Sequence, residues 1–192
     1  MGIRLSLVAA VLAFASCAFA QAKEPFKVDN DFVHKQFGSN CSLLGSQLPM
    51  VGDLNNDGID DIVIPANCTK PLVNAAEDGY RVLDPYNSFF GYGNPKVTTE
   101  FASATPELRG YALLIIHGAG PDAWHSDTPK AKFLIINLPY KEFAVKKVGL
   151  NKKKKKTIMA IYVEEAGGDQ MTSLVSWDGR KYKYSPLGSS LE

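Results

Sequence analysis

Four short apolar runs, each bounded by Gly, Pro, Asn or charged residues, limit most strongly what this chain can fold into. They are Ile62 to Ile64, Tyr111 to Ile116, Phe133 to Leu138 and Ile158 to Val163. Their length is too short for ordinary helices, and their β-branched residues favour strands that are buried on both faces. A weaker strand is expected at Tyr80 to Leu83. The sequence therefore predicts a fold built mainly from strands.

The C-terminal part of the chain predicts a hairpin. Ser173 to Trp177 and Arg180 to Tyr184 flank the pair Asp178-Gly179, which is typical of a type I′ turn. Residues two apart along a strand point the same way, so one face of this hairpin collects large apolar side chains. We expect that face to be buried, with these members: Val175, Trp177, Tyr182 and Tyr184.

One helix is expected near the N-terminus, at Asp31 to Phe37, where Gly38 follows as a stop signal. No internal repeat occurs at the periods typical of propellers or solenoids. Together these patterns predict a mainly β, β-rich α+β fold. We expect a single compact domain of antiparallel strands with one or two short helices, and not a full propeller.

The first 20 residues have the three parts of a secretory signal peptide. Arg4 supplies the positive charge, Leu5 to Phe14 is apolar, and Ala18-Phe19-Ala20 forms the cleavage site. Residues 21–192 then form the single β-rich domain, in a secreted or periplasmic protein. The alternative is a lipoprotein signal, in which Cys17 becomes a lipid-anchored N-terminus.

Charge and hydropathy exclude some partners. The chain has 21 basic and 20 acidic side chains, and one of the basic ones, Arg4, is in the signal. A near-neutral domain gives no reason to expect nucleic acid as a partner, and the run Lys152 to Lys156 is expected to be a solvated turn. No second apolar segment is long enough for a membrane span.

Two cysteines follow the signal, Cys41 and Cys68. A pair of cysteines in an exported protein predicts a disulfide, and two buried free thiols are the alternative. Such a bridge would enclose the residues between them, and closing a segment of that length is worth about 3–4 kcal/mol in the chain-entropy description.

The segment between the cysteines contains a candidate calcium loop. Oxygen-bearing side chains stand at positions 1, 3, 5 and 9 of this loop: Asp53, Asn55, Asp57 and Asp61. Gly58 at position 6 permits a sharp turn, and the carbonyl of Ile59 at position 7 adds another oxygen. Hard oxygen ligands at this spacing suit Ca²⁺. An acidic surface turn without an ion is the alternative.

The residues after the loop decide its type. An EF-hand needs a bidentate Glu at position 12, but Ile64 stands there and Pro65 follows. The segment GDLNNDGIDDIVIPA, residues 52–66, instead resembles FG-GAP and VCBS-type (integrin-like) repeats, with Phe37-Gly38 as the FG pair. That pair lies further from Asp53 than the usual repeat allows. The resemblance covers residues 37–66 and implies a cation site between two strands, but no propeller.

A second segment offers candidate catalytic chemistry. LLIIHGAG, residues 113–120, resembles the oxyanion-donor segment of α/β-hydrolases, but no G-x-S-x-G elbow accompanies it. His117 and His125, with Asp122 and Asp127, can be read as a zinc or acid-base site or as ordinary loop residues. The alternative function is therefore a small secreted hydrolase that uses residues 113–127.

An aromatic segment offers a candidate ligand surface. Between residues 84 and 96, Gly, Pro and Asn alternate with four aromatic side chains: Tyr86, Phe89, Phe90 and Tyr92. Exposed, these rings would form a platform for a sugar ring or a peptide; folded inward, they would cap the core. The leading expectation is an exported, non-enzymatic calcium-binding structural or binding module whose partner is an unknown protein or carbohydrate.

Overall fold

The computed structural model describes residues 27–91, 109–151, 156–166 and 171–189. The expected signal peptide, Cys17 and Tyr92 lie outside these ranges, as does most of the lysine run. The described helices are α1 (Asn30–Phe37), α2 (Pro85–Phe89) and the 3-10 helix η2 (Gly120–His125). The described strands are β1 (Cys41–Leu43), β2 (Met50–Gly52), β3 (Asp61–Cys68), β4 (Tyr80–Leu83), β5 (Tyr111–His117), β6 (Ala131–Ile136), β7 (Tyr140–Asn151), β8 (Lys156–Glu165), β9 (Met171–Trp177) and β10 (Tyr182–Ser189).

The strands form two sheets. The larger sheet has the order β1-β3-β5-β6-β4, and β2 also pairs with β3. β1 and β2 share one edge of β3, because β1 pairs with its C-terminal half and β2 with its N-terminal half. The smaller sheet is an antiparallel meander, β10-β9-β8-β7.

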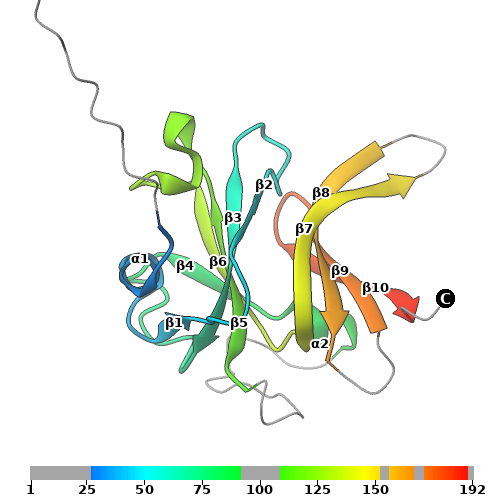
Figure 1. The fold of residues 1–192 in the computed structure, drawn as a ribbon, viewed down its shortest axis with the longest axis horizontal. Coiled ribbons are helices and arrows are strands. Elements are labelled where there is room, and N and C mark those ends of the chain that lie inside the picture. The colour runs from blue at the N-terminus through cyan, green and yellow to red at the C-terminus, as the bar shows by residue number, and fades with distance from the viewer. Residues whose placement is uncertain (1–26, 92–108, 152–155, 167–170, 190–192) are drawn as a thin grey trace, which may run out of the picture.

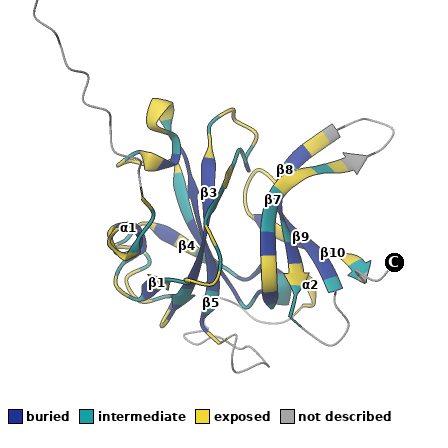
Figure 2. Ribbon diagram, in the orientation of Figure 1, coloured by how far each residue is buried: buried dark blue, intermediate teal, exposed yellow. Residues whose placement is uncertain are grey.

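The larger sheet is the middle of three layers (Figure 1). Helix α1 packs on one of its faces around Phe37, Ile64 and Leu114, and the smaller sheet covers the other face around Ile115 and Val163. The central strands are therefore buried along most of their length, as the dark ribbon of β3 and β5 shows (Figure 2). Burial on both faces explains why the apolar runs are continuous and do not alternate with polar residues.

The predicted β-rich fold is confirmed, as are the helix and the strands within the four apolar runs. Helix α1 begins after Asp29, whose side chain accepts a hydrogen bond from the N–H of Phe32, and ends at Gly38 with φ 78°. One strand pair departs from the antiparallel expectation: β4 runs parallel to β6. The chain between them passes through α2 and β5, and a crossover of this kind lets neighbours run in the same direction.

The predicted type I′ turn of the hairpin is wrong, but the predicted buried face is correct. Tyr182 pairs with Trp177 and Tyr184 with Val175, so four residues, 178–181, connect the strands instead of two. The carboxylate of Asp178 closes this longer loop by accepting the N–H groups of Arg180 and Lys181. A side-chain cap of this kind competes with the Asp-Gly type I′ turn. The side chains of the expected face still lie together between the two sheets.

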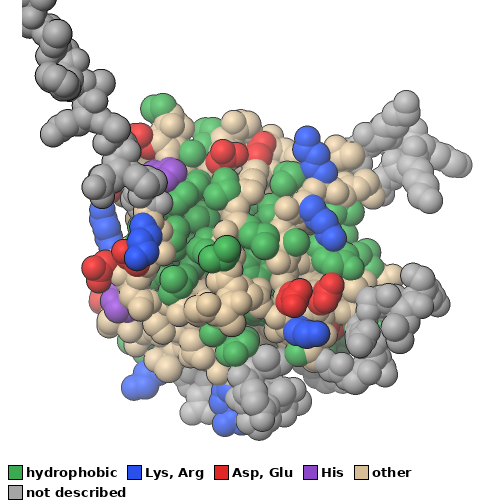
Figure 3. All heavy atoms as spheres, in the orientation of Figure 1, with side chains coloured by type: hydrophobic (Ala, Val, Ile, Leu, Met, Phe, Trp, Pro, Cys, Tyr) green, Lys and Arg blue, Asp and Glu red, His purple; other side chains and the backbone are tan. Residues whose placement is uncertain are grey.

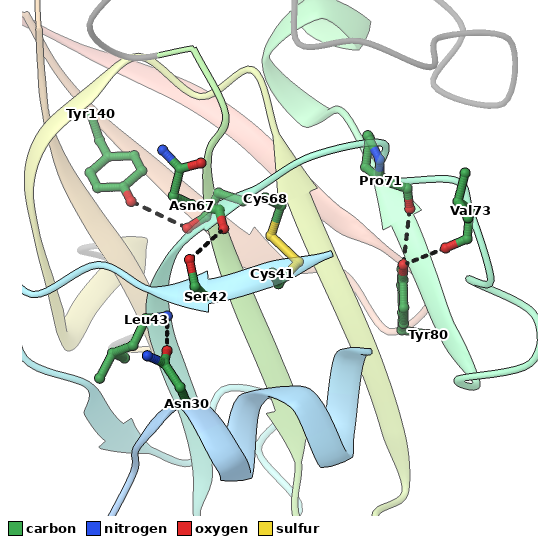
Figure 4. Close-up of a disulfide and its surroundings, with 11 residues drawn as sticks. Asn30, Cys41, Ser42, Leu43, Asn67, Cys68, Pro71, Val73, Tyr80 and Tyr140 are labelled. Carbon is green, nitrogen blue, oxygen red and sulfur yellow. Dashed lines mark hydrogen bonds between the residues drawn. A yellow bond between two sulfur atoms is a disulfide. The ribbon is translucent and has the colours of Figure 1, made fainter. Parts of the chain in front are cut away.

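The disulfide between Cys41 and Cys68 is present (Figure 4). The two residues face each other across β1 and β3, with 4.0 Å between their Cα atoms. Next to them, Leu43 donates its N–H to the side chain of Asn30 at the start of α1, 2.7 Å away. Both cysteines are buried in the same apolar cluster as α1. The bridge therefore fixes a three-residue edge strand and, through it, the adjoining helix α1.

Removing the bridge should destabilise the protein measurably. The double substitution Cys41→Ala/Cys68→Ala should lower the free energy of unfolding by about 3–4 kcal/mol, because the unfolded chain regains the freedom of the enclosed loop. Urea titration followed by circular dichroism measures this change. Wild-type protein in reductant is the control and should show a similar loss. A loss below about 1 kcal/mol in both would mean that strand pairing alone holds β1.

Candidate metal centre

The predicted calcium loop connects β2 to β3 and lies at the same end of the molecule as η2 (Figure 1). Two residues of the loop have positive φ angles, Asn56 at 57° and Gly58 at 84°. An Asn and a Gly adopt this conformation most readily, so the chain can turn twice within a few residues. The loop is therefore a tight turn between two paired strands.

Three of the expected ligand side chains fold onto the backbone of their own loop. The carboxylate of Asp53 accepts the N–H groups of Asp57 and Gly58, at 3.0 and 2.9 Å. The side-chain oxygen of Asn55 accepts the same N–H of Asp57 at 3.0 Å, and Asp57 accepts the N–H of Ile59 at 2.9 Å. These bonds bring the side chains of Asp53, Asn55 and Asp57 together around one turn.

Asp61 has a different environment from the other expected ligands, because it is completely buried. One carboxylate oxygen accepts the N–H groups of Leu54 and Asn55, at 2.9 and 3.3 Å, and the other accepts the N–H of Gly118 at 2.9 Å. Burial raises the pKa of Asp61 to about 6, although these three hydrogen bonds act in the opposite direction. Asp61 therefore joins the loop to the end of β5.

Gly118 follows the last residue of β5 and belongs to the segment of residues 113–120 that resembles an oxyanion-donor loop. It stands where three segments meet, and a Cβ there would collide with the carbonyl oxygen of Asp60 and with the backbone of Ala123 and Trp124. Glycine is therefore required by the close packing of backbones. Gly118 therefore marks the contact between the end of β5 and the candidate calcium loop.

A cationic side chain already lies against the loop. The Nζ of Lys130 is 2.8 Å from a carboxylate oxygen of Asp57, whose side chain is only 21% exposed. Partial burial raises the pKa of Asp57, but hydrogen bonds from Lys130 and Ile59 and the charge of Lys130 outweigh it, so the pKa is lowered. The pKa of Lys130 is raised, chiefly by the same hydrogen bond and then by the charges of Asp57, Asp61 and Asp53.

Acidic residues alone do not complete a metal site here. Within the described ranges, no three side chains of His, Cys, Asp or Glu converge closely enough to hold an ion. The expected ligand set also contains an asparagine oxygen and the backbone carbonyl of Ile59, and Ca²⁺ accepts both kinds of ligand. A calcium ion in this loop would therefore need carboxylate, amide and carbonyl oxygens together.

Removing the Asp61 carboxylate should destabilise the fold. Asp61→Ala should lower the free energy of unfolding by about 2–4 kcal/mol in chelator, because buried N–H groups lose their acceptors. The neighbouring acid Asp60 is exposed, so Asp60→Ala is a matched control with an expected change within about 0.5 kcal/mol. Equal and small losses in both variants would contradict a bracing role for Asp61.

Among the described residues, no three of the four that the sequence offered as a zinc or acid-base site converge closely enough to hold an ion. The ring Nδ1 of His125 lies 3.1 Å from the carbonyl oxygen of Asp122. His117 is buried and shares a hydrogen bond of 2.6 Å with the hydroxyl of Tyr182. His125 is exposed and stacks on Trp124 with 3.7 Å between ring centroids. The carboxylate of Asp127 pairs with Lys35 at 2.8 Å. His117 and Asp127 therefore have separate partners, Tyr182 and Lys35.

His117 is held in its neutral form. Burial is the main reason that its pKa falls to about 4, and its ring lies among Phe133, Trp177 and Tyr182 at centroid distances of 4.9–5.8 Å. A neutral imidazole in an aromatic cluster fits the packing between the two sheets.

This burial predicts a pH dependence of stability. The unfolded chain binds a proton at His117 near pH 6.5 and the folded chain only near pH 4, so stability from this group is complete above pH 6.5 and is lost on acidification. The loss between pH 7 and pH 4 should be about 3 kcal/mol. Urea titrations at several pH values should show a shallower dependence in His117→Gln than in wild type.

Comparing these two proteins cancels the other titrating groups, including Asp61, whose raised pKa acts in the opposite direction. Parallel curves for wild type and His117→Gln would contradict the depressed pKa.

The aromatic segment is partly exposed and partly packed. Tyr86, in α2, packs edge-on against Tyr184 of β10 at 5.1 Å, whereas Phe89 and Phe90 are 51% and 48% exposed. Neither expected arrangement therefore describes the whole segment. Tyr184, which sequence reasoning placed only in the hairpin core, joins this aromatic group because α2 packs on β10.

The described surface shows no single basic area on the face drawn in Figure 3, where acidic and basic side chains are interspersed. None of the helices in the described ranges has the length and apolar character needed to cross a membrane. The disulfide is compatible with export into an oxidising compartment.

The fold and the site define a β-rich, disulfide-containing protein with two sheets. Comparison with models of protein families, with curated protein sequences and with solved structures gives no match. The similarity of residues 37–66 to FG-GAP and VCBS-type repeats therefore stays a prediction.

Proposed function

We propose that this protein is an exported, non-enzymatic module that binds one Ca²⁺ ion in the loop Asp53–Asp61. The observation that carries the proposal is the arrangement of Asp53, Asn55 and Asp57 around one tight turn. The ammonium group of Lys130 already pairs with Asp57 in this turn. Carboxylates this close to one another are stabilised by positive charge. A divalent ion supplies more positive charge than one ammonium group.

The ligand set follows from the acceptor capacity that the hydrogen bonds leave. Each carboxylate oxygen has two lone pairs, and both oxygens of Asp53 use only one for a backbone N–H. The Asp57 oxygen that accepts the N–H of Ile59 likewise uses one lone pair for it. Asp53, Asn55, Asp57 and the carbonyl of Ile59 would hold the ion, and Asp61 retains one acceptor position beside Gly118. The ion supplies positive charge and orders the loop.

Calcium has to compete with Lys130, whose ammonium group lies on Asp57. A site of this kind fits the modest affinity of extracellular calcium modules. With a dissociation constant near 0.1 mM and about 1 mM free calcium, binding would stabilise the fold by roughly 1.4 kcal/mol. This is enough to order the end of the molecule where the loop meets η2, so we propose that calcium stabilises that surface for a partner.

Calorimetric titration with calcium tests the proposal. We expect saturable one-site binding by the wild type, with a higher melting temperature than in chelator. Asp57→Asn should abolish this binding, whereas Asp60→Asn makes the same charge change on an exposed neighbour and should preserve it. Binding of equal strength by the two variants would refute the ligand assignment.

Lys130→Met separates calcium binding from simple neutralisation by the lysine. If calcium binds, removing the competing ammonium should strengthen calcium binding about threefold to tenfold. If the loop is only an acidic turn paired with Lys130, neither the wild type nor this variant will release heat with calcium. That result would remove the metal site.

The alternative, a small hydrolase using residues 113–127, has no specific observation in its favour. His117 is enclosed by aromatic rings, and His125 stacks on Trp124 on the surface. We therefore keep the binding module as the proposed function.

A further inference from the structure

A cavity of about 370 Å³ lies between α2 and β10, away from the calcium loop. In Figure 1, α2 is near the lower end of the molecule and the calcium loop is near the upper end. The cavity combines a buried acid, aromatic rings and lysines. The lining residues used here are Asp84, Ser88, Phe89, Lys181, Lys183 and Tyr184.

Asp84 is an unusual lining residue, because it is a carboxylate with only 4% of its surface exposed. Its hydrogen bonds come from amide groups: the N–H and side chain of Asn87, at 3.0 and 2.8 Å, and the side chain of Asn137 at 2.6 Å. None of the ion pairs between described residues includes it. The oxygen bonded to the Asn87 N–H accepts no other of these bonds, so it retains capacity for a donor.

Aromatic rings in fixed positions form one wall. Phe89 lies edge-on to Tyr184 with 5.2 Å between ring centroids, and the Tyr184 hydroxyl donates to Glu165 at 2.6 Å. Tyr184 is therefore held from both ends, while Phe89 is 51% exposed. Phe89 packs against this fixed ring, so its exposed side offers an apolar surface at little entropic cost on binding.

Lysine side chains of β10 and its preceding loop supply donors at the cavity. Lys183 pairs with Asp178 at 2.9 Å, and its side chain is 57% exposed. Lys181 is also exposed. The cavity thus presents an acceptor at Asp84, donors at two lysines and Ser88, and an apolar wall.

We propose that this cavity binds one sugar unit of an oligosaccharide. A pyranose ring has an apolar C–H face that can stack on Phe89 and hydroxyl groups that can both donate and accept. One hydroxyl would donate to Asp84, and Lys181 would donate to a hydroxyl or carboxylate oxygen of the sugar. A purely apolar ligand would leave Asp84 without a new partner while excluding water from it, which is unfavourable.

The proposal does not depend on calcium, because none of the cavity residues belongs to the calcium loop. Binding should therefore persist in chelator and in Asp57→Asn. Loss of calcium binding with retained sugar binding would affect only the proposed function. Loss of sugar binding with intact calcium binding would affect only this inference.

The test is a titration of the full mature protein with neutral and acidic saccharides, namely glucose, galactose, N-acetylglucosamine, glucuronic acid and their β-linked oligomers. Binding is followed by NMR shifts and calorimetry. We expect one or more of these oligomers to bind. Phe89→Ala should weaken that binding at least tenfold, and Lys181→Ala should weaken it at least threefold. Leu48→Ala, which shortens an apolar side chain that is 78% exposed elsewhere, should leave it unchanged.

Asp84→Asn is a further variant. Because Asp84 also caps α2, circular dichroism has to check that this variant protein is folded. Lys181→Ala and Phe89→Ala change exposed side chains and keep the inference testable if that variant unfolds. Absence of binding by every saccharide would overturn the proposal. Binding unaffected by both exposed substitutions would also overturn it, because the sugar would then lie elsewhere.

Discussion

The buried carboxylate of Asp61 connects parts of this protein that are far apart in the sequence. It begins β3, accepts N–H groups from the loop that precedes it, and accepts another from Gly118 at the end of β5. A fully buried acid is costly to desolvate, and its raised pKa reflects that cost. The hydrogen bonds offset it only while loop and strand keep this arrangement, so Asp61 makes the shape of the loop depend on the core.

The same region links the two sheets. His117 precedes Gly118 and shares a hydrogen bond with Tyr182 of β10, the strand that also lines the proposed sugar cavity. Burial, with the charge of Asp61 as a smaller cause, raises the pKa of Tyr182, so its hydroxyl keeps its proton. The candidate calcium loop and the cavity thus lie on elements that share one aromatic interior.

Local patterns predicted the central elements because each carried its own signal. The apolar runs identified β3, β5, β6 and β8, and Gly38 ends α1 as expected, whereas the N-cap is Asp29, before the expected start at Asp31. Weak local signals explain the misses. β1 and β2 have three residues each and exist because β3 offers them an edge, and β7 contains too many charged residues to read as a buried strand. α2 has only five residues, and its Pro and Asn are more typical of turns than of a helix.

The sequence by itself determined the β-rich class, the disulfide and the spacing of the loop residues, because periodicity, cysteine pairing and turn chemistry act over a few residues. Only the tertiary structure decided that Asp61 braces the core, that Lys130 lies on Asp57, and that Tyr184 joins the aromatic group of α2. These contacts join residues from different strands, helices and loops. Their energies depend on burial and on charges brought close by the packing of the two sheets, which no short stretch of sequence contains.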